Sequence, residues 1–134
     1  MNAYEDGETI VVDVMRHPRM FDTDLHGPGE GPPTLERWSI DRAAGKVHRE
    51  CLDDTPQESP RIDERRIGRR YRYGYAPTVG RGLDEGDALH KHDMQRCQTI
   101  TREFGAGRQA GEFVFEPHTP DFRRRPRSLD ELRL

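Results

Sequence analysis

The sequence predicts an all-β protein whose strands form an antiparallel meander. Three observations favour this class: one continuous β-branched apolar segment, several shorter strand-like segments separated by turn-rich loops, and no window with a helical apolar stripe. Strands that follow one another without intervening helices are typical of propeller blades and sandwiches. No internal repeat in the sequence chooses between these two architectures.

The strongest strand is predicted over residues 9–15, Thr-Ile-Val-Val-Asp-Val-Met, which are mainly β-branched and apolar. It ends before His17-Pro18, because proline cannot donate an amide hydrogen to a ladder. The segment from Asp22 to Pro33 then holds three glycines and three prolines. That composition predicts a long exposed loop.

A β-hairpin is predicted next, because two strand-like segments flank a short turn. Leu35–Asp41 alternates imperfectly between apolar and polar residues, and Lys46–Leu52 follows a turn in which Gly45 is free to adopt a positive φ. Further strands are expected at Tyr71–Ala76, Ala88–Met94, Thr99–Phe104 and Glu112–Glu116.

Composition limits how well this sequence can fold by itself. Only 31% of its 134 residues are hydrophobic and 35% are charged, with a mean hydropathy of −1.04. Ordering the backbone costs roughly 1–2 kcal/mol per residue, and few large apolar side chains are present to offset that cost. We therefore expect the fold to need contacts with polypeptide that this sequence does not encode.

Charge and hydropathy argue against two classes of partner. The net charge of −3 and the pI near 6.1 disfavour nucleic acid, although a local basic run occurs. This run consists of Arg61, Arg65, Arg66, Arg69, Arg70 and Arg72. No segment reaches the ~20 apolar residues of a membrane span, and no signal pattern is present, so we expect a cytoplasmic protein without a transmembrane segment.

The histidines and cysteines do not specify a metal site. His90 and His92 would lie on one face of a strand, but two ligands do not complete a site, and neither Asp87 nor Asp93 is suitably spaced. We interpret the pair as polar strand residues near solvent. The other histidines are expected at the surface: His17, His26, His48 and His118. The two cysteines, Cys51 and Cys97, are interpreted as small reduced fillers.

No residue of the sequence is predicted to be catalytic. Its serines lack nucleophile-elbow glycines, neither cysteine has a neighbouring activating histidine, and no dinucleotide or phosphate-binding glycine loop occurs. The alternating Tyr71, Tyr73 and Tyr75 predict an aromatic row on one face of a strand. Such a row favours packing against a neighbouring strand over a platform for stacking bases.

Several segments, in one order over roughly residues 2 to 120, resemble the later part of a known family. They are Asn2–Gly7, Ile10–Val14, Leu35–Asp41, Glu58–Asp63, Tyr71–Tyr75, Lys91–Asp93 and Gly111–Pro117. The family is that of the carotenoid cleavage oxygenases, which includes carotenoid, apocarotenoid and lignostilbene dioxygenases and the vertebrate retinoid isomerase. The resemblance implies a fragment of the C-terminal half, with about two to three antiparallel blades of a seven-bladed β-propeller.

The resemblance also implies a chemistry for the complete enzyme. In the family, four histidines hold a non-haem Fe(II), and glutamates orient three of them. Such an iron activates O₂ to split a carbon–carbon double bond in an apolar conjugated substrate, a carotenoid, apocarotenoid or stilbene. One functional position carries over: Glu58 matches a glutamate that accepts a hydrogen bond from a ligand imidazole.

This sequence departs from the family pattern at the iron ligands. The third ligand histidine would fall two residues upstream of Met1, and none of the histidines present, His92 included, matches a ligand position. We therefore expect this chain alone to bind no Fe(II) and to be inactive. The alternatives are a non-catalytic β-rich binding module, or one half of a split oxygenase completed by a separately encoded N-terminal half.

Residues 1–121 are thus interpreted as an incomplete oxygenase propeller and residues 122–134 as an arginine-rich tail. The family continues with an acidic Glu-Asp-Asp-Gly-Trp segment where this chain runs Asp121-Phe-Arg-Arg-Arg-Pro-Arg. A frameshift in GC-rich DNA would produce such a replacement. Our hypothesis is that the tail is out of frame, and the absence of the acidic codons from all three downstream frames would contradict it.

Overall fold

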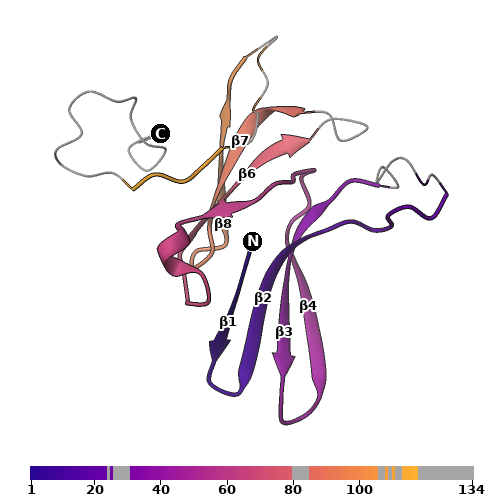
Figure 1. Ribbon diagram of the computed structural model, residues 1–134, viewed down its shortest axis with the longest axis vertical. Coiled ribbons are helices and arrows are strands. Elements are labelled where there is room, and N and C mark those ends of the chain that lie inside the picture. The colour runs from indigo at the N-terminus through magenta and orange to yellow at the C-terminus, as the bar shows by residue number, and fades with distance from the viewer. Residues whose placement is uncertain are drawn as a thin grey trace.

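The computed structural model describes residues 1–23, 25, 31–79, 85–105, 108, 110 and 113–117. In this part of the chain, eight strands form two four-stranded antiparallel sheets, and the single helix is one 3₁₀ turn (Figure 1). The prediction of an all-β meander is confirmed. Each sheet has the topology of a propeller blade, so the two sheets agree with the expected two to three blades.

Each strand pairs with the next one along the chain. The first sheet contains β1 (Asn2–Asp6), β2 (Thr9–Arg16), β3 (Thr34–Asp41) and β4 (Lys46–Asp53). The second contains β5 (Arg61–Ile62), β6 (Tyr73–Val79), β7 (Glu85–Asp93) and β8 (Gln98–Glu103). The 3₁₀ helix η1 (Glu64–Arg66) follows β5 and begins at Asp63, whose carboxylate accepts a hydrogen bond from the Arg65 amide.

Six of the predicted strands are present, with shifted ends. The predictions at 9–15, 35–41 and 46–52 agree with β2, β3 and β4 to within one residue, and those at 71–76, 88–94 and 99–104 correspond to β6, β7 and β8. The expected hairpin turn is also confirmed, because Gly45 has a φ of 62°. At this turn the Asp41 side chain accepts a hydrogen bond from the Ala44 amide at 2.8 Å.

One predicted strand is wrong and two strands were not predicted. Residues 113–116 of the expected Glu112–Glu116 strand belong to no ladder, while Glu112 lies outside the described residues. This segment is held instead by the Arg61 side chain, whose Nε donates to the Phe113 carbonyl at 3.1 Å. The unpredicted strands are β1, which is mostly polar, and β5, which has only two residues.

The apolar core is small and lies between the two sheets. It consists of Tyr4, Val11, Leu35, Ile62, Tyr71 and Met94, with Met1, Met15 and Leu52 packed against it. The rings of Tyr4 and Tyr71 meet edge to face with their centroids 6.3 Å apart. Residues of both sheets therefore share one cluster, as expected for two neighbouring blades.

A buried carboxylate joins the two sheets at this core. The fully buried side chain of Asp13 on β2 accepts hydrogen bonds from Arg37 Nε at 2.7 Å and Nη2 at 3.0 Å. It also accepts one from the Tyr71 hydroxyl at 2.7 Å. Burial and the negative charge of Asp13 raise the pKa of Tyr71, so the phenol stays protonated and remains a donor. The hydrogen bonds from Arg37 to Asp13 raise the pKa of Arg37.

Asn2 forms a second polar link between the sheets. Its side-chain amide donates to the Arg69 carbonyl at 2.9 Å and the Arg66 carbonyl at 3.3 Å, and its oxygen accepts from the Gly68 amide at 3.1 Å. Gly68 has a φ of 74°, a conformation that glycine adopts without strain. The first residue of β1 thereby fixes the loop that follows η1.

We expect replacement of Asp13 by alanine to destabilise the fold by about 3–5 kcal/mol, because it leaves the Arg37 guanidinium in a partly buried site without its anion. The matched control, Arg42→Ala, removes an exposed arginine that pairs with Glu5 and Glu8, and should cost under about 1 kcal/mol. Urea unfolding followed by circular dichroism measures both. Equal losses in the two variants would contradict the assigned role of Asp13.

Candidate functional site

The first candidate site is a histidine–carboxylate pair beside the sheet junction. His17, directly after β2, has its Nε2 atom 3.1 Å from Oε1 of Glu58, which lies in the connection between β4 and β5. The His17 side chain is 7% exposed and that of Glu58 is 35% exposed. The expectation of a surface histidine at position 17 is therefore wrong, because folding brings residues 41 positions apart into contact.

Two backbone features place Glu58 at this junction. Its amide donates to the Pro77 carbonyl of β6 at 3.2 Å. The next residue, Ser59, has a φ of 48°, so the chain turns sharply before β5 begins at Arg61. On the other side of the pair, His17 Nδ1 is buried without a hydrogen-bond partner among the described residues. Only one nitrogen of this imidazole is thus satisfied by protein groups.

The second candidate site is a buried histidine pair on β7. His90 and His92 lie on one face of the strand, as predicted, with ring centroids 5.9 Å apart. Each residue is only 3% exposed, so the expected position near solvent is wrong. The prediction placed both histidines near solvent. Alternation along a strand shows which residues share a face, but it does not show which of the two faces is covered.

His92 belongs to a hydrogen-bond network that spans both sheets. Its Nε2 atom lies 2.6 Å from Oε1 of the fully buried Gln57, and its Nδ1 atom lies 3.0 Å from Oγ1 of Thr99. The Thr99 hydroxyl also donates to Asp53 Oδ2 at 2.7 Å. Because that hydroxyl has one hydrogen, it can donate to Asp53 or to His92 Nδ1 but not to both, and while it donates to Asp53 it can accept a hydrogen bond from Nδ1 only when Nδ1 is protonated.

Burial governs the titration of this network. It lowers the pKa of His92 to about 4 and also lowers that of His90, because a buried imidazole is harder to charge. Burial acts in the opposite sense on Asp53, but hydrogen bonds from Thr99 and Thr55 outweigh it and the pKa of Asp53 is lowered. The network therefore holds neutral histidines beside a charged carboxylate at neutral pH.

These residues do not form a metal centre. His90 Nδ1 bonds Thr101 Oγ1 at 2.8 Å, and its Nε2 is buried without a partner in the described part of the chain. Asp93 is paired with Arg72 at 2.8 Å. In the ranges that the structure describes, no group of three or more His, Cys, Asp and Glu side chains is disposed to hold a metal ion.

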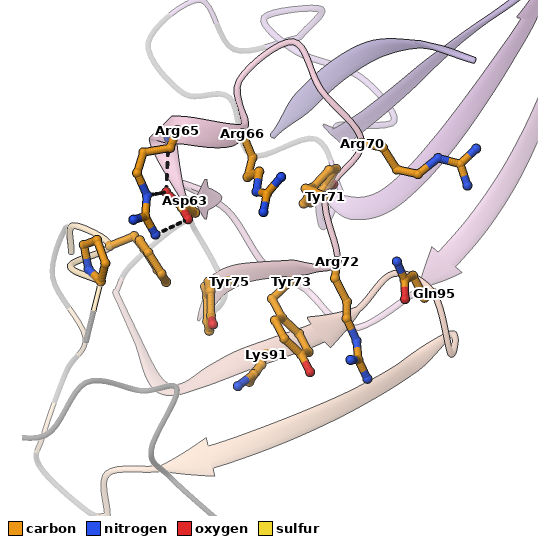
Figure 2. Close-up of a pocket in the computed structure, with 12 residues that line it drawn as sticks. Asp63, Arg65, Arg66, Arg70, Tyr71, Arg72, Tyr73, Tyr75, Lys91 and Gln95 are labelled. Carbon is orange, nitrogen blue, oxygen red and sulfur yellow. Dashed lines mark hydrogen bonds and ion pairs between the residues drawn. The ribbon is translucent and has the colours of Figure 1, made fainter. Parts of the chain in front are cut away.

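The third candidate site is a pocket of about 660 Å³ beside η1 and β6, which we call the basic pocket (Figure 2). Its lining residues are Asp63, Arg65, Arg66, Arg70, Tyr71, Arg72, Tyr73, Tyr75, Lys91, Gln95, Phe115 and Pro117. Most of the basic run identified in the sequence is therefore gathered in one place. The run is evident in the sequence, but its place in the lining of a pocket was not predicted.

The predicted tyrosine row is only partly formed. Tyr71 precedes β6 and is buried in the core, whereas Tyr75 packs against Phe115 with centroids 5.8 Å apart. Tyr73 lies under two cations, with Lys91 Nζ 4.4 Å and Arg72 Cζ 4.8 Å from its ring centroid. Packing against a neighbouring strand, as expected for the row, is seen for Tyr71 against Tyr4 of β1, whereas Phe115 beside Tyr75 belongs to no ladder.

The cysteines depart from expectation in one respect. Cys51 and Cys97 are free thiols, as predicted, but both are exposed and neither fills the core. Cys97 has a φ of 51° in the turn between β7 and β8, a conformation that is uncommon for residues other than glycine.

Comparison with known proteins decides the family. The sequence profile of the RPE65 family, described as retinal pigment epithelial membrane protein, matches residues 1–125. The chain belongs to this family. In the described residues, no helix of the RPE65-family chain is long and apolar enough to cross a membrane.

Relatives of this RPE65-family chain are carotenoid oxygenases. It is 37% identical over 129 residues to a carotenoid cleavage oxygenase of Mycobacterium tuberculosis, covering 88% of this chain and 26% of that protein. It is 26% identical over 125 residues to the apocarotenoid-15,15'-oxygenase of Synechocystis, covering 87% and 26%. The resemblance to carotenoid cleavage oxygenases is confirmed, and the chain spans about a quarter of the length of these relatives.

Solved structures of the family share this fold. The cobalt-substituted Synechocystis ACO superposes with a TM-score of 0.74 at 27% identity, covering 87% of this chain and 26% of that one. An ACO/RPE65 chimera gives a TM-score of 0.75 at 28% identity, covering 90% and 27%. These structures are β-propellers, so the two sheets correspond to part of a propeller.

We expect the stability of the fold to decrease as the pH falls from 6.5 to about 4, the range between the ordinary and the lowered pKa of His92. The unfolded chain takes up a proton there that the folded chain does not, which costs about 3 kcal/mol of stability. Urea unfolding across this range should show a shallower slope for His92→Gln. The exposed control His48→Gln should leave the slope unchanged, and an unchanged slope in both variants would contradict the assignment.

Proposed function

We propose that this chain supplies two blades of a carotenoid oxygenase that uses Fe(II) and O₂ to split a carbon–carbon double bond in an apolar conjugated substrate. The match of the RPE65-family profile to residues 1–125 carries this proposal. Carotenoids, apocarotenoids and stilbenes all fit this proposal, because the relatives of the chain include oxygenases named for each of these substrates. The 134 residues of this sequence account for part of such a propeller. A separately encoded N-terminal half that supplies other blades, and a cytoplasmic location of the assembled enzyme, belong to the same proposal.

Glu58 is the residue of this chain that we assign to the reaction centre. Its Oε1 atom already lies 3.1 Å from an imidazole nitrogen, that of His17. A carboxylate in this position fixes the tautomer and ring orientation of the imidazole that it binds. In the complete enzyme we propose that Glu58 accepts a hydrogen bond from an iron-ligating histidine that lies outside these 134 residues.

The residues described here do not fit a complete iron site. Glu58 and His17 form a pair, and no third His, Cys, Asp or Glu in the described ranges joins them to hold a metal ion. Non-haem iron requires several convergent ligands with open positions for O₂ and substrate. We therefore propose that the chain by itself neither retains iron nor catalyses cleavage, and we assign it no catalytic residue.

Iron content tests the first part of this proposal. After anaerobic addition of Fe(II) and desalting, we expect the 134-residue chain to retain no stoichiometric iron, as measured by elemental analysis alongside circular dichroism. Tight one-to-one iron in a cooperatively folded β-protein would contradict it. The imidazoles of His17 and His90, each with a buried nitrogen that has no partner among the described residues, would then be the first ligands to examine.

A chimera tests the role of Glu58. Residues 1–117 of this chain would replace the matching segment of the Mycobacterium tuberculosis carotenoid cleavage oxygenase, to which the chain is 37% identical. We expect the chimera to bind iron and Glu58→Gln to weaken iron binding about 10- to 100-fold, because the ligand imidazole loses its acceptor. The control Glu64→Gln changes an exposed carboxylate of η1. Equal iron affinity in both variants would overturn the role of Glu58.

A further inference from the structure

The basic pocket carries a charge opposite to that of the whole chain. Five of its lining residues are cationic and one, Asp63, is acidic, whereas the chain has a net charge of −3. The cations come from separate elements: η1, the loop between η1 and β6, and β7. Folding therefore concentrates positive charge that is scattered in the sequence, as it does in sites that attract anions.

Ion pairs neutralise part of the positive charge of the pocket. Arg65 is paired with Asp63 at 2.6 Å, and Figure 2 shows its guanidinium turned onto that carboxylate. Arg70 and Arg72 are paired with Asp6 and Asp93, which do not line the pocket. Arg66 projects from η1 on one side of the pocket and Lys91 from β7 on another. Arg66 and Lys91 therefore do not converge on one point, as they would have to do to bind a compact oxyanion together.

The aromatic floor of the pocket is already covered. Tyr73 lies beneath Lys91 and Arg72, and Tyr75 packs against Phe115. Stacking of a nucleobase would need an open ring face, and these faces are occupied by cations or by another ring. The pocket consequently offers distributed positive charge and hydrogen-bond donors rather than a stacking platform.

We propose that the basic pocket binds an acidic polypeptide segment of a partner. A segment with several spaced carboxylates can meet Arg66 from η1 on one side of the pocket and Lys91 from β7 on another at the same time, which a single compact anion is less suited to do. The volume of about 660 Å³ is suited to a short run of side chains. This inference does not depend on the oxygenase activity proposed above, since it rests only on the shape and charge of the pocket.

Binding of a labelled peptide of alternating Glu and Ser to the full-length chain tests the proposal. Fluorescence anisotropy should show binding that weakens as salt is raised, and no binding of the matched peptide of alternating Gln and Ser. The double variant Arg66→Gln/Lys91→Gln should bind the acidic peptide about fivefold or more weakly. The control Arg102→Gln, which removes an exposed arginine of β8 outside the pocket, should bind it unchanged.

Cross-linking locates the peptide on the unmodified chain, so the test does not depend on the variants folding. The chain has two lysines, Lys91 in the pocket and Lys46 on β4 outside it. A carbodiimide should join carboxylates of the bound peptide to Lys91 in preference to Lys46, as read by mass spectrometry of the digest.

Four results would overturn the proposal. The first is no binding of the acidic peptide, and the second is an equal loss of affinity in the control variant. The third is cross-linking to Lys46 as readily as to Lys91. The fourth is competition by inorganic pyrophosphate or single-stranded DNA at concentrations where the unlabelled acidic peptide does not compete. Competition by pyrophosphate would assign the pocket to a small oxyanion, and competition by DNA would assign it to nucleic acid. Neither outcome bears on iron binding or on Glu58.

Discussion

The contact between Asp13, Arg37 and Tyr71 is the constraint on which the arrangement of the two sheets depends. With so few large apolar residues, the core between the sheets is a single small cluster, and hydrophobic burial alone would leave their relative orientation loosely specified. A charged carboxylate with no exposed surface tolerates only a geometry that satisfies it. Because Arg37 reaches Asp13 from β3 of the first sheet and Tyr71 reaches it from the segment that leads into β6 of the second, that requirement fixes the position of one blade against the other.

A second set of buried polar contacts also joins the two sheets. Gln57 is fully buried in the connection between the sheets and meets His92 of β7, while Asp53 of β4 meets Thr99 of β8. Buried polar groups are costly unless paired, so a network of this kind penalises any displacement of one blade along the other. It also makes the interface sensitive to protonation, which an apolar interface would not be. Geometric specificity and pH dependence therefore share one physical origin in this fold.

Sequence patterns predicted the parts of the fold that local chemistry determines. Strands β2, β3 and β4 carry apolar or alternating residues and end at proline or glycine turns, so their positions are local properties. Strand β1 has no apolar pattern. It pairs with β2, and its Tyr4 and Asn2 contact residues of the segment between η1 and β6. The contact of His17 with Glu58 likewise joins distant parts of the chain. Only the resemblance to a family had pointed to Glu58, and nothing in the sequence had pointed to its partner.

The contact of Glu58 with His17 in this structure is compatible with the contact to an iron-ligating histidine that we propose for the complete enzyme. The Glu58 carboxylate faces an imidazole Nε2 atom, and in this orientation it can accept a hydrogen bond from a histidine of any polypeptide. Glu58 has a second oxygen and is about one-third exposed, so a further imidazole can approach it without displacing His17 first. His17 then remains within the same hydrogen-bonded group, with its buried Nδ1 still lacking a partner in the described part of the chain. Burying this nitrogen without a hydrogen bond costs free energy. A hydrogen bond from additional polypeptide around Glu58 and His17 would remove that cost and so favour assembly over the isolated pair of blades.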